Sequence, residues 1–191
     1  MKKNENPLVL SLVLLVISAV VALLLGFTNS VTKEKIAENV LIEQNAAKQE
    51  VLKDAFDFLE VEFGDKTGLV KGVFQGVDQN GKHVGWCVNV TPIGYGGELD
   101  IMVGINPDKT LSGMKVVSHS ETAGLGAKAT DETFSSQFRS KKTDKPLEVI
   151  KSGTPKDNEI VAISGATITS KAVRTGVNAA IDAVNSVKGG A

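Results

Sequence analysis

The sequence has 191 residues but only one cysteine, Cys87, and two histidines, His83 and His119. A single cysteine cannot form a disulfide within the chain. It also excludes zinc and iron–sulfur sites that take several thiolates from this chain. Two histidines are too few for a histidine-rich metal cage. We therefore expect no metal site.

An excess of one charge sign is also absent, because 21 basic residues accompany 22 acidic ones and the net charge is −1. A protein that holds a nucleic-acid backbone usually carries a basic surplus. We therefore expect no nucleic-acid partner. The sequence also lacks a pattern that pairs a nucleophile with a general base, so we expect no catalytic residues.

Residues 8–27 form a long apolar run without any charge, in which Ser11 and Ser18 are the only clearly polar residues. At about 1.5 Å per residue, the run spans about 30 Å, the thickness of a bilayer core. A soluble core helix of this length usually shows a polar face, and a cleaved signal peptide has a shorter apolar region followed by small residues. Of these three alternatives, the run favours a retained single-pass transmembrane helix in contact with membrane lipid.

Charges on both sides of this run bear on its orientation in the cell membrane. Lys2 and Lys3 precede the run, and Lys33 and Lys35 follow it. By the positive-inside rule, the first pair predicts that residues 1–7 are cytoplasmic and that the bulk of the chain is extracytoplasmic. The second pair favours the opposite orientation and weakens this prediction.

After the run, apolar residues first recur at helical spacing and then alternate. Val51, Ala55 and Leu59 continue a helical period, which predicts a stalk or packing helix over residues 28–62. Residues 63–191 are expected to form one domain, with a hairpin turn at Asn80-Gly81. The predicted strands cover 70–77, 83–90, 99–105, 111–118, 147–150 and 160–163, and the predicted helices cover 131–138 and about 170–187. This order indicates an α+β fold with an antiparallel sheet and flanking helices.

Three loops of the domain are rich in glycine or hydroxyl side chains, namely residues 94–97, 121–126 and 164–170. Glycine lets a backbone approach a planar ligand closely, but the same residues make ordinary tight turns. The last loop lies between a predicted strand and the final helix, where free N–H groups and the helix dipole attract a phosphate. Its hydroxyl residues Thr167, Thr169 and Ser170 could equally cap the helix. On these residues alone, both interpretations stay open.

Taken together, these features resemble the G subunits of Rnf electron-transport complexes. Their FMN-binding domain is related to that of the C subunit of sodium-translocating NADH:quinone oxidoreductase. The resemblance covers essentially the whole chain, and several ordered matches are more specific than any one motif. Besides the apolar run, the matching stretches are residues 29–38, Gly-Tyr-Gly-Gly at 94–97, His-Ser-Glu-Thr-Ala-Gly-Leu-Gly at 119–126, Phe134, Phe138 and Ser-Gly-Ala-Thr-Ile-Thr-Ser at 164–170.

The resemblance implies that a flavin transferase attaches FMN covalently, through an ester between its phosphate and a threonine. The family motif places this acceptor at Thr167, and Thr169 is the nearest competitor. His119 and Glu121 would tune the flavin or relay protons, or would have only a surface role. The other residues implied to hold the cofactor are Ser164, Gly165, Ala166, Thr169, Ser170, Tyr95, Gly96, Glu121, Thr122, Gly124, Leu125 and Gly126.

Two positions depart from the family pattern. The family often has an acidic residue where this chain has Val161, and a proline where it has Ala123. If the transferase recognises that acid, modification of this chain would be slower. Alanine in place of proline leaves the loop less rigid in the unfolded chain. Neither change removes the acceptor threonine.

The resemblance further implies a role as an electron carrier, in which FMN supplies the redox chemistry and the protein supplies placement and electrostatics. Its partners would be the other membrane and peripheral subunits of an Rnf complex. That complex would couple electron transfer between ferredoxin and NAD to sodium or proton translocation. The chain would thus be a redox subunit of a translocase, with no independent catalysis. The alternatives are the C subunit of the quinone reductase, which is typically longer, and a membrane-anchored flavin-binding sensor.

Overall fold

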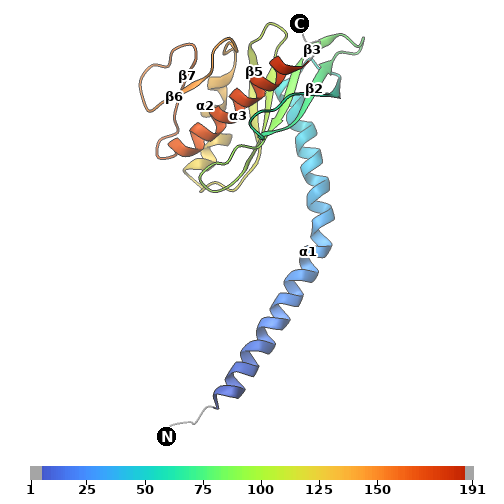
Figure 1. Cartoon of the computed structure of the whole chain (residues 1–191), viewed down its shortest axis with the longest axis vertical. Helices are drawn as coiled ribbons and strands as arrows, with labels where there is room; N and C mark the ends of the chain where they lie inside the picture. Colours follow the sequence, from blue (N-terminus) through green and yellow to red (C-terminus); the bar gives the residue numbers. More distant parts are fainter. Residues whose placement is uncertain (1–5, 188–191) are drawn as a thin grey trace. The chain divides into compact units, whose positions relative to one another are not determined.

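The computed structural model describes residues 6–187 of the chain (Figure 1). Two units are distinguished, Met1–Ile42 and Glu43–Ala191. Helix α1 (Pro7–Val51) begins in the first unit and ends in the second. The expected cytoplasmic segment, residues 1–7, lies almost entirely outside the described residues.

The described part of the first unit is helix α1, whose N-terminal portion is strongly apolar. An 18-residue window within its stretch Pro7–Lys33 has a mean hydropathy of 3.2, and among the described residues this helix is the one that is apolar and long enough to cross a bilayer. The Thr28 hydroxyl donates a hydrogen bond to the Leu24 carbonyl oxygen at 2.9 Å, and the Thr32 hydroxyl donates to the Thr28 carbonyl oxygen at 2.9 Å. These bonds satisfy the hydroxyls without ending the helix. The expected apolar helix is therefore confirmed, and it continues into the following segment without a break.

The predicted extension of this helix to residue 62 is wrong. Helix α1 ends at Val51, and strand β1 (Asp57–Val61) follows after a short turn. The Phe56 N–H donates to the Val77 carbonyl oxygen at 2.7 Å, which begins an antiparallel pairing with the next strand. Leu59 and Val61 alternate with glutamates, and this period of two suits a strand better than a helix. The pairing with a neighbouring strand overrides the helical spacing.

The second unit contains a five-stranded antiparallel sheet in the order β1-β2-β3-β4-β5. The strands after β1 are β2 (Val70–Val77), β3 (His83–Val90), β4 (Leu99–Ile105) and β5 (Leu111–His119). Neighbours in sequence are neighbours in the sheet, as expected for consecutive hairpins. The α+β class and the antiparallel sheet predicted from the alternating pattern are confirmed.

Short elements connect this sheet to the last helix. They are the 3₁₀ helix η1 (Gly126–Thr130), helix α2 (Glu132–Ser135), the 3₁₀ helix η2 (Ser136–Phe138), and the parallel strands β6 (Glu148–Ile150) and β7 (Glu159–Val161). Helix α3 (Thr167–Ser186) starts three residues before its predicted beginning. Figure 1 shows α3, in red, lying across the strands of the large sheet.

The large sheet is buried on both faces. On one face, apolar side chains of the strands pack with those of α3 and the η2 segment; this cluster includes Val73, Val88, Val103, Phe138, Val173 and Val177. On the other face, Cys87 and Met102 pack with Ala47 and Val51 from the last turns of α1. The central strand β3 therefore contributes to both cores.

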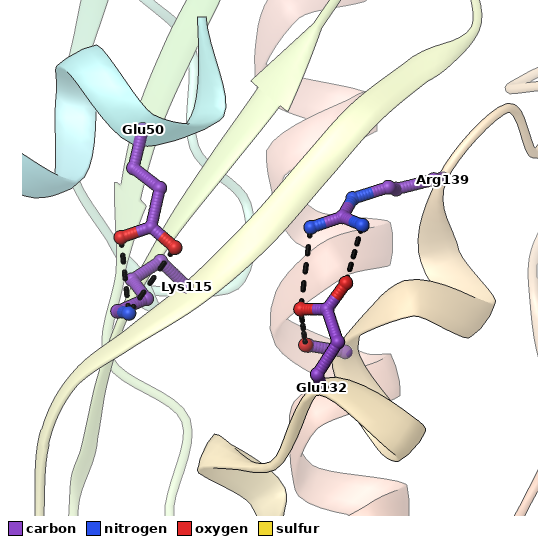
Figure 2. A network of polar contacts seen from close by, with 5 residues as sticks. Glu50, Lys115, Glu132 and Arg139 are labelled. Atoms are coloured by element: carbon purple, nitrogen blue, oxygen red, sulfur yellow. Dashed lines mark hydrogen bonds and ion pairs between the residues drawn. The ribbon is translucent and has the colours of Figure 1, made fainter.

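Ion pairs at the edges of the domain add little to this core (Figure 2). Glu50, near the end of α1, approaches Lys115 of β5 with 3.0 Å between Oε2 and Nζ. Glu132 of α2 binds the Arg139 guanidinium through both carboxylate oxygens. All four side chains are at least 42% exposed, so each pair is expected to contribute less than about 1 kcal/mol.

Cys87 is expected to resist alkylation while the domain is folded. Its side chain is fully buried, and burial raises the pKa of the thiol from 9.0 to about 12. At pH 8 this shift lowers the thiolate fraction roughly 1,000-fold. Iodoacetamide should therefore label the protein only after denaturant is added, as measured by intact-protein mass. Equal labelling rates with and without denaturant would contradict this burial.

Candidate functional site

The three loops singled out in the sequence meet around one cavity of about 460 Å³. This volume lies within the range of small-molecule sites. Each loop contributes to the wall, which consists of Tyr95, Glu121, Thr122, Leu125, Gly126, Gly165, Ala166, Thr167, Ile168 and Thr169. The fold thus brings together segments that are far apart in the chain.

The N-terminus of α3 opens on this cavity. Thr167 is the first residue of the helix, and Ala166 precedes it in a non-helical conformation with φ −132°. Among the described residues, no side chain caps this end of α3. The first N–H groups of a helix have no partner within the helix, and they carry its partial positive charge. The arrangement therefore suits an anionic group, and of the two interpretations left open by the sequence, a hydroxyl cap on α3 is not seen among the described residues.

The hydroxyl residues of this loop have different surroundings. Thr167 is half-buried on the cavity wall. Thr169 is 1% exposed, and its hydroxyl donates to Glu121 Oε2 at 2.7 Å. Ser170 is fully buried; its hydroxyl donates to the Ala166 carbonyl oxygen at 3.0 Å and accepts from the Ile163 N–H at 3.0 Å. Thr169 and Ser170 therefore hold the loop in place. Within residues 6–187, the Thr167 hydroxyl at the helix start makes no hydrogen bond to another protein group.

Glu121 joins the other two loops to α3. Its side chain is buried, with the residue 8% exposed. Oε1 accepts hydrogen bonds from the N–H of Tyr95 at 2.8 Å and of Gly96 at 3.0 Å, while Oε2 accepts the bond from Thr169. The Glu121 N–H donates to His119 Nδ1 at 3.2 Å, which fixes the start of its loop. His119 itself lies at the end of β5, outside the set of cavity-lining residues.

Close packing around Glu121 explains two of the glycines. A Cβ atom on Gly94 would lie 2.1 Å from Glu121 Oε1, and one on Gly126 would lie 2.1 Å from Glu121 Oε2. Both distances are far below van der Waals contact, so any side chain at either position would displace the carboxylate. These two glycines are therefore required by the approach of the loops to one another.

Apolar side chains surround the cavity entrance. Tyr95 is 73% exposed, Ile168 is 56% exposed and Leu125 is 45% exposed. Such exposed apolar groups beside a cavity are typical of a site for a planar, partly apolar ligand. The sequence reasoning missed Ile168. Its position between two motif threonines on an exposed helical turn was the available signal.

The remaining predicted residues lie near the cavity. Gly96 contributes its N–H to Glu121, and Gly124 adopts φ 76° in the turn before Leu125. Ser164 is exposed in the turn between β7 and α3, and Ser170 is buried in the first turns of α3. Among the described residues, these four are not part of the cavity wall.

Val161, the first of the two departures from the family pattern, lies in strand β7. Its N–H donates to Gln137 Oε1 at 2.8 Å, and its carbonyl oxygen accepts from Gln137 Nε2 at 3.2 Å. The Gln137 amide thus occupies the free edge of this short strand. Ala123, the second departure, is exposed in its loop.

Comparison with known proteins agrees with this arrangement. Residues 94–182 match the family model of the FMN-binding domain. The chain is 42% identical to the G subunit of the Na⁺-translocating ferredoxin:NAD⁺ oxidoreductase complex of Acetobacterium woodii, covering 90% of this chain and 88% of that protein. It is 37% identical to the G subunit of an ion-translocating oxidoreductase complex of Methanosarcina acetivorans (92% and 93% covered). A third relative, the G subunit of the proton-translocating ferredoxin:NAD⁺ oxidoreductase complex of Clostridium ljungdahlii, is 35% identical (84% and 82% covered).

Solved structures show the same fold at lower identity. NqrC of Shewanella oneidensis superposes with a TM-score of 0.54 at 22% identity, covering 71% of this chain and 70% of that one. The C subunit of the Na⁺-translocating NADH-quinone reductase of Parabacteroides distasonis gives a TM-score of 0.51 at 26% identity, covering 61% and 64%. The family assignment rests on the three G subunits, whose sequences match most of the length of this chain. These matches confirm the resemblance inferred from the motifs. The chain therefore belongs to the family of G subunits of Rnf-type ion-translocating oxidoreductase complexes, with an FMN-binding domain.

Proposed function

We propose that this chain is an electron-carrier subunit whose FMN is esterified through its phosphate to Thr167 Oγ1. The observation that carries the proposal is the N-terminus of α3, where Thr167 stands at an uncapped helix end beside the cavity. A phosphate bonded there keeps a negative charge next to free N–H groups and the positive end of the helix. When bound, FMN would supply the redox chemistry.

Thr167 is favoured over Thr169 because the two hydroxyls differ in accessibility. The Thr169 hydroxyl is buried and already donates to Glu121. To accept a phosphate, it would have to break this bond and move into the open. The Thr167 side chain is half-buried on the cavity wall, within reach of a modifying enzyme.

The protein's own groups would position the flavin ring. Leu125 and Ile168 offer apolar contacts at the entrance, and Tyr95 offers an aromatic face. Because these three wall residues of the cavity of about 460 Å³ are exposed, a flavin ring held there would keep an edge at the surface. An exposed edge suits exchange of electrons with other proteins.

The relatives suggest the partners. In Acetobacterium woodii and Clostridium ljungdahlii, the similar subunits belong to complexes named for ferredoxin, NAD⁺ and translocation of Na⁺ or protons. We infer that this chain works in such a complex and receives FMN from a flavin transferase. Helix α1 would anchor it in the cell membrane, with residues 1–7 cytoplasmic and the FMN-binding domain on the outer side.

The alternative assignment, to the C subunit of a sodium-translocating quinone reductase, has weaker support. The solved structures of C subunits are 22% and 26% identical to this chain, whereas the G subunits named above are 35% to 42% identical. The membrane-anchored flavin-binding sensor also has weaker support, because the relatives that match nearly the whole chain are named as subunits of oxidoreductase complexes.

The site of attachment can be tested on the full-length chain. Co-expression with a flavin transferase should give a protein that fluoresces on a denaturing gel. Peptide mass analysis should then find the mass of esterified FMN on Thr167. The protein made without the transferase is the control and should carry no covalent flavin. A wild-type chain that never fluoresces would contradict the electron-carrier proposal.

A further inference from the structure

Glu121 is a buried carboxylate whose hydrogen bonds all go to other parts of the site. It receives two backbone N–H groups from the loop at residues 94–97 and one hydroxyl from α3. Because all three partners donate, the group acts only as an acceptor, as an ionised carboxylate does. Charge-assisted bonds of this kind are stronger than neutral ones.

We propose that Glu121 is a positioning residue that clamps the three loops of the cavity into one rigid site. This inference rests on the proposed attachment of FMN for its functional meaning, but the clamp itself is a property of the protein alone. The side chain acts on the cofactor through Tyr95, Gly96 and Thr169. It holds the wall of the cavity in position before any cofactor arrives.

Packing on both sides of the carboxylate supports this role. A Cβ atom on Gly94 or Gly126 would collide with one of the carboxylate oxygens. A Cβ atom on Gly96 would lie 2.2 Å from the Ser120 carbonyl oxygen, so the two loops also touch through their backbones. The Gly94 N–H donates to the Gly97 carbonyl oxygen at 2.7 Å, which closes the first loop into a tight turn around Glu121 Oε1. No other side chain in the described cavity wall hydrogen-bonds to both neighbouring loops.

The charge of Glu121 gives the clamp a second effect. Glu121 belongs to the cavity wall, so its carboxylate would lie beside a flavin held there. A nearby negative charge opposes the addition of an electron, and low local dielectric strengthens this effect. Removing the charge while keeping the shape should therefore raise the midpoint potential of the bound flavin.

The clamp is tested first without flavin. In the full-length chain in detergent, hydrogen exchange followed by mass spectrometry reports the protection of residues 94–97. Glu121→Ala removes the acceptor and should speed exchange of Tyr95 and Gly96 about tenfold, because both amides lose their partner. Glu121→Gln keeps a carbonyl oxygen for both amides and should retain most of the protection. Glu98→Ala, an exposed acidic residue at the end of the same loop, is the matched control and should leave exchange unchanged.

A second arm measures the flavin. After co-expression with the transferase, Glu121→Ala should carry about tenfold less covalent FMN than wild type, since the acceptor loop is no longer fixed. Glu121→Gln should carry nearly the wild-type amount and show a higher midpoint potential.

The outcomes separate the clamp from the proposed function. Wild-type exchange rates in Glu121→Ala would overturn the clamp. If Glu121→Ala does not fold, Glu121→Asp takes its place, because its carboxylate is one methylene shorter and is withdrawn from both amides; wild-type exchange of Tyr95 and Gly96 in that variant would overturn the clamp as well. Faster exchange in Glu121→Ala combined with a wild-type chain that never binds flavin would instead leave the clamp standing and reject the proposed function.

Discussion

Thr167→Ala is expected to abolish covalent flavin in the full-length chain co-expressed with a flavin transferase. The substitution removes the hydroxyl oxygen that would form the ester and leaves the backbone at the start of α3 in place. Alanine is also a good helix former, so α3 should keep its length. In-gel fluorescence after denaturation measures the loss directly, and peptide mass analysis shows whether any flavin has moved to another residue.

Two further variants distinguish loss of the acceptor hydroxyl from disturbance of the loop that carries it. Thr167→Ser retains a hydroxyl at the same place and should retain covalent flavin. Thr169→Val removes the hydroxyl that donates to Glu121, yet it should still carry flavin at a reduced level because the acceptor is intact. If Thr167→Ala fluoresces and Thr169→Val does not, the acceptor is Thr169.

Phe138→Ala is expected to lower the free energy of unfolding of the domain by about 3–5 kcal/mol, the usual cost of removing a buried phenylalanine. Phe138 is fully buried in the core between the sheet and α3. Its ring meets that of Phe134 edge to face, with 5.5 Å between centroids. The loss therefore includes an aromatic contact as well as the cavity left behind. The same residue ends η2, so the loop that precedes it would also lose its support.

Denaturant titration can follow this change through Trp86, the only tryptophan of the chain, which lies in the same core cluster. The matched control is Phe56→Ala. Phe56 is 66% exposed, and its loss should change stability by no more than about 0.5 kcal/mol. Equal effects of the two substitutions would mean that Phe138 does not belong to the core.

Much of the fold could be predicted because its pattern is local. The strands β2 to β5 are short, largely apolar runs between clear turns, and the bounds of β2, β3 and β4 agree with their predictions. The end of α1 could not be predicted in the same way. Val51, Ala55 and Leu59 continue a helical period, while Leu59 and Val61 already begin an alternating one. The pairing of residues 57–61 with strand β2 is what makes this segment a strand and not a continuation of the helix.

The candidate site, like the fold, has features that the local sequence predicts and features that depend on contacts between distant residues. Its three loops could be located from their glycines and hydroxyls, because these residue types mark close turns wherever they occur. The role of Glu121 could not, because its partner Thr169 is 48 residues away in the sequence and Tyr95 is 26 residues away. Likewise, nothing local distinguishes the Thr169 hydroxyl from that of Thr167. Burial against another loop separates them, and burial depends on the whole fold.

The helix end at Thr167 links maturation of the protein to its folding. Without the cofactor, the first turn of α3 presents N–H groups that no side chain of the described chain caps. A phosphate ester on Thr167 would supply these acceptors from within the same turn. A dissociable ligand stabilises a protein only as far as its concentration exceeds its dissociation constant. A bonded ligand has no such dependence. The flavin transferase would therefore add the missing cap to the N-terminus of α3. The mature domain would keep the stabilisation that this phosphate cap gives even where free flavin is very dilute.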